Sequence, residues 1–235
     1  MEVKGFVGVS LSDWDGKVSS VLFLPNCNLR CPFCYNKDLV LNPEKMPTIP
    51  EKHIEDYLKS NRKWVDGVVI TGGEPTLHQD LPSLCERMKE IGFRAKLDTN
   101  GTNPTVTRDL VERKLVDYVA LDVKAPLTAE KYSRACGISA SSVVERVRET
   151  VRLLLDGAVE YEFRTTLVPT VHEIEDVEAM CRAIKGCKKY VLQNFKPDVE
   201  TIEPSYQSLT AFTRVQMDSF LQVAKRIIPN SVVRG

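Results

Sequence analysis

The sequence predicts an α/β fold with a parallel sheet, and three features of the chain support this prediction. Short β-branched runs alternate with longer segments of helical periodicity, which is typical of strand–helix–strand units. The runs are uniformly apolar, as in residues 67–71, and this is the pattern of parallel strands buried on both faces. Repeats, low-complexity tracts and linkers are absent from the sequence, so we expect one domain over residues 1–235.

The first quarter of the chain is predicted to lead into the sheet. Residues 1–16 alternate loosely up to an Asp-Trp-Asp-Gly turn, which favours an N-terminal hairpin or edge strand before a first barrel strand at about 17–24. A loop at 25–48 carries four prolines, which stiffen a segment without a hydrogen-bond ladder of its own. Thr48 is the expected N-cap of a helix that ends near Asn61.

Strands and helices then alternate to the end of the chain. The further strands are expected at 67–71, 94–99, 117–123, 161–168 and 189–195. The helices between and after them are expected at about 80–91, 104–113, 140–156, 173–185 and 210–228. A closing strand is expected at 232–234.

These segments make six strand–helix units, too few for the closed eight-fold barrel. We place the barrel core at about 17–200 and a C-terminal helix with the closing strand at about 201–235. Right-handed crossovers would bring the carboxyl ends of the strands to one edge. The motifs of the chain fall at those ends, with Cys27 after the first strand, Gly72 after the second and Asp98 after the third.

Charge and composition narrow the function classes. Lys+Arg and Asp+Glu number 32 each, so no general affinity for polyanions is implied and nucleic acid is not expected as a partner. No run reaches the ~18 apolar residues of a membrane helix, and the first residues lack the pattern of a signal peptide. We expect a cytoplasmic protein, because three of the seven cysteines are clustered rather than arranged as a disulfide framework.

The clustered cysteines are Cys27, Cys31 and Cys34, on the loop that leaves the first predicted strand. Three thiolates on a short loop can surround one inorganic group. A structural zinc site and an ordinary electron-carrier cluster take four ligands, whereas three leave one metal position open to substrate. Half of a zinc site, a redox pair with a spare thiol, and small core residues remain alternatives. The remaining cysteines are expected to be small, partly buried thiols: Cys85, Cys136, Cys181 and Cys187.

Several motifs together resemble a known family. The order Cys-x-x-x-Cys-x-Phe-Cys at 27–34, followed by Thr-Gly-Gly-Glu-Pro at 71–75, resembles the radical S-adenosylmethionine (SAM) superfamily. Asp-x-x-Gly-Lys at 13–17, Cys-Tyr-Asn at 34–36 and Leu-Asp-Thr-Asn-Gly at 97–101 are similar to the glycyl-radical-enzyme activating enzymes. The branch of anaerobic ribonucleoside-triphosphate reductase activating proteins looks closest. The resemblance runs from about residue 5 to about residue 200.

The resemblance implies a partial (β/α)6 barrel that is open on one side. It also implies a [4Fe–4S] cluster held by Cys27, Cys31 and Cys34, with the fourth iron chelated by the amino and carboxylate groups of SAM. Phe33 would pack beside the adenine, although packing within the loop explains this ring equally well.

The Gly-Gly-Glu turn has a physical rationale beside the resemblance. Gly72 and Gly73 would let the backbone approach the cofactor closely. Glu74 would accept hydrogen bonds from the SAM ammonium. An ordinary turn is the alternative for a Gly-Gly-Glu sequence found alone.

Acidic residues follow the third and fourth predicted strands. Asp98 and Asp122 could serve as general acid and base, or bind a hard cation together with Thr99. The resemblance implies a monovalent cation beside the methionyl group, with Lys124 facing the SAM carboxylate. A surface pair between an aspartate and the lysine, contributing little to stability, is the alternative.

Two later residues match family positions, and one residue departs from them. The resemblance places Arg164 near the cofactor or substrate and Asn194 where a side chain contacts the ribose. Tyr35 stands where these enzymes often have His, so its role is left open. No cysteine-rich insertion for further clusters is present, which favours a compact activating enzyme.

The function implied by the resemblance is reductive cleavage of SAM and formation of a glycyl radical on a partner enzyme. That partner would be an anaerobic ribonucleotide reductase, and the electron donor a flavodoxin or ferredoxin. One alternative keeps the cofactors and changes the substrate to a small molecule or modified-nucleoside precursor, as in the deazaguanine-forming synthases. The other is a non-catalytic zinc or cluster scaffold.

Overall fold

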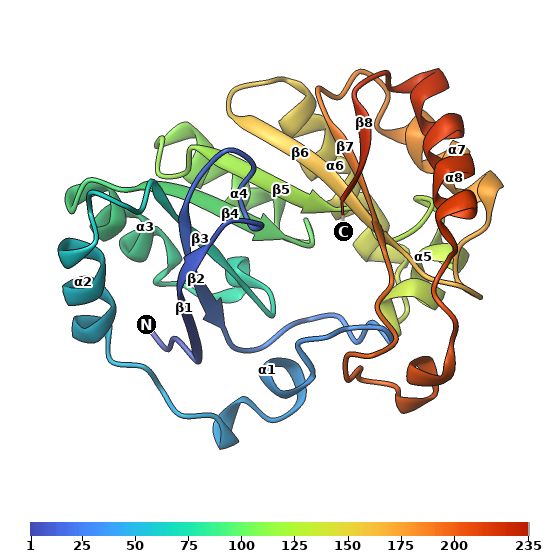
Figure 1. The fold of residues 1–235 in the computed structure, drawn as a ribbon. Helices are drawn as coiled ribbons and strands as arrows, with labels where there is room; N and C mark the ends of the chain where they lie inside the picture. Colours follow the sequence, from blue (N-terminus) through green and yellow to red (C-terminus); the bar gives the residue numbers. More distant parts are fainter. Residues whose placement is uncertain (235) are drawn as a thin grey trace.

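An eight-stranded sheet whose strands follow one another in chain order, from β1 to β8, forms the centre of the structure (Figure 1). The structure is a computed structural model and describes residues 1–234. β1 (Gly5–Ser10) runs antiparallel to β2 (Ser19–Leu24), and every later strand is parallel to its predecessor. The later strands are β3 (Gly67–Gly72), β4 (Arg94–Thr99), β5 (Tyr118–Asp122), β6 (Glu160–Leu167), β7 (Tyr190–Asn194) and β8 (Ser231–Arg234).

Most helices cover the outer face of the curved sheet, whereas α1 belongs to the loop segment between β2 and α2 (Figure 1). In chain order the helices are α1 (Lys37–Leu41), α2 (Glu51–Ser60), α3 (Leu81–Glu90), α4 (Pro104–Glu112), α5 (Ala129–Cys136), α6 (Ser141–Leu155), α7 (Ile174–Ala183) and α8 (Arg214–Ile227). β1 and β8 remain unpaired with each other, so the barrel is open between them. Of the helices within residues 1–234, none has both the length and the apolar character needed to cross a membrane.

Two apolar clusters lie on opposite faces of the sheet, because successive side chains of a strand point to opposite sides. Val68 and Ile70 belong to the large cluster that packs under the helices. Val69, between them, belongs to a small cluster with Trp14 and Val21 on the other face. The small cluster fills the part of the barrel where the strands begin and leaves the carboxyl ends of the strands for other side chains.

The predicted order of elements is confirmed, and the differences are local. All six predicted barrel strands and the closing strand are present, with boundaries that differ by one or two residues. The loop predicted at 25–48 contains the short helix α1, and α5 was not predicted at all. The prediction of Thr48 as N-cap is wrong, because α2 begins after Pro50 and the Thr48 hydroxyl instead accepts a hydrogen bond from Lys4 Nζ at 2.9 Å.

Candidate active site

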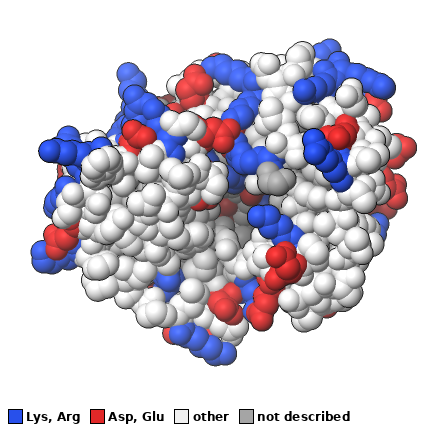
Figure 2. Space-filling model, viewed as in Figure 1, with Lys and Arg blue, Asp and Glu red and all other residues white. Residues whose placement is uncertain are grey.

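A cavity of about 200 Å³ lies at the carboxyl ends of β2 to β5 and is bounded by the cysteine loop. Figure 2 shows the hollow in the open side of the sheet, with acidic and basic side chains around it. Most of the predicted site residues line the cavity: Cys27, Cys31, Phe33, Cys34, Gly72, Gly73, Asp98, Thr99, Asp122 and Lys124. Three predicted residues do not line it: Glu74, Arg164 and Asn194.

The cysteine loop brings three free thiols to this one cavity. Cys31 is buried, and Cys27 and Cys34 are partly exposed. The N–H of Cys34 donates to the carbonyl of Cys31 at 3.0 Å, which makes the tight turn that directs both side chains inward. Asn26 has a φ of 64°, a left-handed conformation that asparagine tolerates and that turns the chain out of β2.

The environment of these thiols favours their protonated forms. Burial raises the pKa of Cys27 to about 12 and also raises the pKa of Cys34. For Cys31, a hydrogen bond with the thiol of Cys136, together with burial, raises the pKa well above its ordinary value. Thiolates in such a place require a bound cation to stabilise them, and metal binding would release the protons.

A segment from residue 195 to residue 209, which we call the strap, crosses the cysteine loop. The N–H of Ile202 donates to the carbonyl of Cys34 at 3.2 Å, and the N–H of Glu203 donates to the carbonyl of Pro32 at 2.9 Å. Backbone hydrogen bonds of this kind hold the loop in one conformation on its outer side. The strap therefore lies against the outer side of the cysteine loop, and none of its residues lines the cavity.

Gly72 and Gly73 lie so close to the backbone of Leu24 and Asn26 that a side chain at either position would clash with it. Gly72 has a φ of 121°, and a Cβ there would lie 2.4 Å from the backbone nitrogen and oxygen of Leu24. A Cβ on Gly73 would lie 1.8 Å from the carbonyl oxygen of Asn26. Asn36 Nδ2 donates to the carbonyl of Gly72 at 2.6 Å. The glycines thus join the end of β3 to the cysteine loop.

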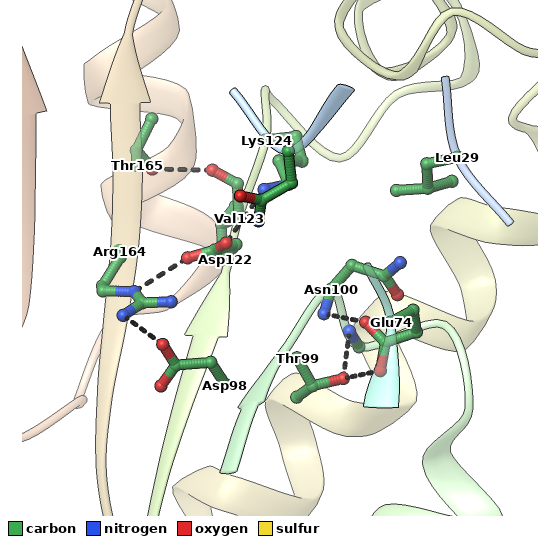
Figure 3. Close-up of polar contacts among 12 residues, drawn as sticks. Leu29, Glu74, Asp98, Thr99, Asn100, Asp122, Val123, Lys124, Arg164 and Thr165 are labelled. Carbon is green, nitrogen blue, oxygen red and sulfur yellow. Dashed lines mark hydrogen bonds and ion pairs between the residues drawn. The ribbon is translucent and has the colours of Figure 1, made fainter. Parts of the chain in front are cut away.

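Glu74 is fully buried, and its carboxylate contacts neighbouring residues of the protein and does not line the cavity (Figure 3). Its Oε1 accepts hydrogen bonds from Thr76 N at 3.1 Å, Thr76 Oγ1 at 2.6 Å and Thr99 Oγ1 at 2.7 Å. Its Oε2 accepts from Asn100 N at 2.7 Å. Although burial raises the pKa of this carboxyl, the four donors oppose that shift. The expected direct contact with the SAM ammonium is not supported, because the carboxylate already has these partners.

Arg164 lies beneath the cavity and bridges two carboxylates that line it (Figure 3). Nη1 donates to Asp98 Oδ2 at 3.0 Å, and Nε donates to Asp122 Oδ1 at 2.8 Å. Lys96 Nζ also lies 3.2 Å from Asp98 Oδ1. Burial would raise the pKa of Asp122, but Arg164 and Lys124 hold it well below its usual range.

These ion pairs bear on the predicted cation site. Basic side chains of the protein balance the charge of Asp98 and Asp122, and the hydroxyl of Thr99 is used by Glu74. In the part of the chain that the structure describes, no three His, Cys, Asp or Glu side chains are grouped to hold a single metal ion, and this includes the three thiols of the cysteine loop. The monovalent cation site at Asp98, Thr99 and Asp122 consists of two carboxylates and a hydroxyl, and it stays a prediction.

Lys124 is held over the cavity from several sides. Its Nζ donates to Asp122 Oδ2 at 2.9 Å, and the pKa of the ammonium is raised because this carboxylate outweighs the effect of burial. His172 Nδ1 accepts from Val168 N at 3.0 Å, so Nε2 carries the proton and donates to the carbonyl of Lys124 at 2.8 Å. Lys124 therefore presents a fixed positive charge to the cavity.

Phe33 and Asn194 have different surroundings. Phe33 lines the cavity, and its ring lies 6.4 Å from that of Tyr206 in the strap. Asn194 donates from Nδ2 to the carbonyl of Phe212 at 2.7 Å, so this amide faces the segment that leads into α8. The structure does not bring Asn194 to the cavity.

Sequence reasoning missed several residues that line the cavity. They are Leu29, Tyr35, Asn36, Val40, Thr71, Asn100 and Thr166. Asn36 and Asn100 stand inside the motifs at 34–36 and 97–101, so their place in those motifs was an available signal. Thr166 follows Arg164 by two positions on β6 and so points to the same face, a signal that strand periodicity also offers.

The donor set fits an iron–sulfur cluster with one open iron. Three thiols on one loop border a cavity that is larger than a single ion, as three-cysteine ligation of a cubane requires. Lys124 and the backbone of the Gly-Gly turn border the same space and are suited to a zwitterionic ligand with a carboxylate. Fold and cavity together define an α/β enzyme with its site at the strand ends.

Comparisons with known proteins agree with this class. Residues 21–184 match the Radical SAM superfamily, and the chain belongs to that superfamily. Its cofactors are accordingly a [4Fe–4S] cluster and SAM. A protein of Methanocaldococcus jannaschii with the provisional name of glycyl-radical enzyme activating enzyme is 34% identical over 99% of this chain and 95% of that protein.

Two other proteins are similar to the chain. The 7-carboxy-7-deazaguanine synthase of Thermococcus kodakarensis is 27% identical over 80% of this chain and 77% of that enzyme. The crystal structure of Streptococcus suis SuiB bound to S-adenosylmethionine superposes with a TM-score of 0.66 at 18% identity. It covers 92% of this chain and 52% of SuiB, so the chain spans about half the length of SuiB and the likeness shows the fold.

Proposed function

We propose that this protein is an activating enzyme that uses SAM to generate a glycyl radical on a partner enzyme, an anaerobic ribonucleotide reductase. The observation that carries the proposal is the set of three free thiols around one cavity at the strand ends. The relative that is 34% identical over 99% of the chain supports the activating type. A flavodoxin or ferredoxin is the proposed electron donor.

The residues around the cavity take complementary roles in this proposal. Cys27, Cys31 and Cys34 would hold the cluster, which when bound and reduced would supply the electron for reductive cleavage of SAM. Lys124 orients the carboxylate of SAM through its fixed charge. Phe33 provides an apolar surface for the adenine. The partner's glycine would then give up a hydrogen atom at the open side of the barrel.

Asp98 and Asp122 support this arrangement from below. Their pairing with Arg164 holds both side chains in place at the edge of the cavity. The strap holds the cysteine loop from its outer side and would slow access of water to the cluster through that loop.

The first test concerns the cysteines. We expect the anaerobically reconstituted protein to bind about four irons per chain and to cleave SAM when reduced. Cys31→Ala should lose the cluster and at least ~100-fold of the cleavage rate, since a thiolate ligand is removed. Cys85→Ala is the matched control, because Cys85 is buried on α3 and does not line the cavity. Cleavage that survives in Cys31→Ala at the wild-type rate would contradict the cluster assignment.

A second candidate function has a specific observation in its favour. The similarity to a 7-carboxy-7-deazaguanine synthase extends over 80% of this chain, and both candidates would use the same cofactors. Incubation of the reduced protein and SAM with the reductase of the same cell separates them. A glycyl-radical doublet in the electron paramagnetic resonance spectrum supports the activating function. Conversion of a modified-nucleoside precursor without that doublet would support the synthase instead.

A further inference from the structure

Asn100 reaches the sulfur of a cluster-binding cysteine from the end of β4. Its Nδ2 lies 3.8 Å from Cys27 Sγ and 3.0 Å from Asn28 Oδ1. The N–H of Leu29 donates to the same sulfur at 3.4 Å. Asn100 is 6% exposed and borders the cavity. The sulfur of Cys27 is therefore approached by two hydrogen-bond donors from the protein.

The neighbours of Asn100 fix which end of its amide faces the sulfur. The N–H and the hydroxyl of Thr102 meet Asn100 Oδ1 at 3.0 and 2.7 Å. A backbone N–H can only donate, so the atom that it meets has to be the amide oxygen. The Thr102 hydroxyl accepts from Asn28 Nδ2 at 2.8 Å, so its own hydrogen is free to go to Asn100. The amide nitrogen of Asn100 consequently points toward Cys27.

The backbone of Asn100 is fixed by Glu74 of the Gly-Gly-Glu turn (Figure 3). Glu74 Oε2 accepts from Asn100 N at 2.7 Å, and Glu74 Oε1 accepts from Thr99 Oγ1 at 2.7 Å. Both Glu74 and Thr99 are buried, so these bonds are protected from competition by water. The turn after β3 thereby sets the position of an amide that contacts the cysteine loop.

We infer that Asn100 is a positioning residue that tunes the cluster: its amide N–H donates to the Cys27 thiolate and makes the bound cluster easier to reduce. Reduction adds negative charge to the cluster and its sulfurs, and a hydrogen bond to sulfur stabilises the more negative state more strongly. Glu74 and Thr102 act through Asn100, by holding its backbone and its amide oxygen. The inference rests only on the cluster that the proposed function assigns to Cys27, and it is independent of the partner.

The test compares two asparagines of the same network. Asn100→Ala removes the donor to Cys27, whereas Asn103→Ala removes an amide that donates to the carbonyl of Thr76 at 2.9 Å. We expect Asn100→Ala to lower the reduced fraction of the reconstituted cluster about tenfold at a fixed solution potential, equal to about 59 mV for a one-electron couple. Asn103→Ala should keep the wild-type midpoint potential. Thr102→Val keeps the side-chain shape and should shift the potential in the same direction by less.

Two readouts decide the outcome. Redox titration followed by electron paramagnetic resonance gives the midpoint potential, and protein labelled with ¹⁵N-asparagine should show a nitrogen coupling to the reduced cluster that Asn100→Ala lacks. A purely structural role would move neither quantity. Equal potentials in Asn100→Ala and wild type, or equal shifts in Asn100→Ala and Asn103→Ala, would overturn the inference. SAM cleavage by the wild-type protein is measured separately, so the proposed function can stand when the inference fails.

Discussion

Arg164 is a buried arginine inside the barrel whose charge is balanced by two aspartates. Its side chain is 12% exposed, and it contacts two aspartates whose carboxylates are 10% and 29% exposed. Removing one partner of a buried pair leaves the other charge without compensation, which costs far more than the pair contributes. The three side chains therefore behave as one unit.

Arg164→Leu should lower the free energy of unfolding by about 3 kcal/mol at neutral pH, because Asp98 and Asp122 would each lose a buried cationic partner and keep only one lysine, Lys96 and Lys124 respectively. Urea denaturation measures this loss. Arg113→Leu is the control: Arg113 also pairs with two acids, Glu86 and Asp109, but is 43% exposed. Arg113→Leu should leave the urea midpoint close to that of the wild type, because exposed ion pairs contribute little to stability. Equal losses of unfolding free energy in the two variants would show that the buried ion pairs of Arg164 stabilise the fold no more than the exposed ion pairs of Arg113.

The cost of Arg164→Leu should also depend on pH. Since Arg164 and Lys124, against the effect of burial, hold the pKa of Asp122 below its usual range, their pairing stabilises the fold above the unfolded pKa of about 3.9 and is lost as the pH falls. The variant lacks most of this contribution. The difference in unfolding free energy from wild type should therefore be largest near pH 7 and shrink at about pH 3.5. A difference that is constant between these two pH values would contradict the assignment.

The sequence predicted which residues lie at the site better than it predicted which partners those residues contact. The cysteines, Asp98 and Lys124 were placed from sequence because their spacing and strand-end positions are local features. The partners of Glu74 could not be predicted, because they come from the next strand and depend on how β3 and β4 lie together. The same holds for Asn100, whose bond to sulfur joins two segments far apart in the sequence.

At the scale of elements, the strap and the cysteine loop depend on each other. Tyr35 stacks on Phe195 with ring centres 5.9 Å apart, and its hydroxyl accepts from Lys196 N at 2.6 Å. Tyr35 thus anchors the start of the strap beside the last cysteine of the loop. The role of Tyr35 was left open because the residue departs from the family's usual His, and the partners that the structure gives it lie about 160 positions away in the sequence.

Tyr35→Phe should make the reconstituted cluster bleach in air about fivefold faster, because one hydrogen bond of about 1 kcal/mol no longer holds the strap closed. The decay of visible absorbance measures this rate. Tyr161→Phe is a matched control, since its hydroxyl accepts from Lys188 N at 3.4 Å, and Tyr161 does not line the cavity. Equal bleaching rates in Tyr35→Phe and wild type would show that the strap does not protect the cluster.

Strands were easier to predict than short helices. Some parallel strands carry a compact apolar run, such as Val-Val-Ile in β3 and Val-Ala-Leu in β5, so their sequence gives the signal within five or six residues. α1 and α5 have only five and eight residues, too few for helical periodicity to stand out. α5 ends where Gly137, with a φ of 68°, lies close to the carbonyl of Arg30, and this contact with the cysteine loop is tertiary.

In the whole molecule, apolar side chains fill the end of the barrel where the strands begin, and the cavity lies at the end where the strands finish. Trp14, 6% exposed, packs on Val21 and Val69 where the strands begin, and its ring lies 5.9 Å from that of Tyr118. A Cβ on Gly67 would come within 2.7 Å of the Trp14 ring, so the glycine makes room for it. The catalytic cavity lies at the opposite ends of the same strands.

Because the packed end and the cavity lie at opposite ends of the strands, we expect a change at Trp14 to affect stability and leave cofactor binding intact. Trp14→Ala should lower the free energy of unfolding by about 3–5 kcal/mol, because it leaves a cavity among Val21, Val69 and Tyr118. Trp64→Ala, at a tryptophan that is 75% exposed, should change it by no more than about 0.5 kcal/mol. Urea denaturation of both variants measures the effect. Folded Trp14→Ala should still bind the wild-type amount of iron, since the cysteines lie at the far ends of the strands; loss of iron from the folded variant would show that the two ends are coupled.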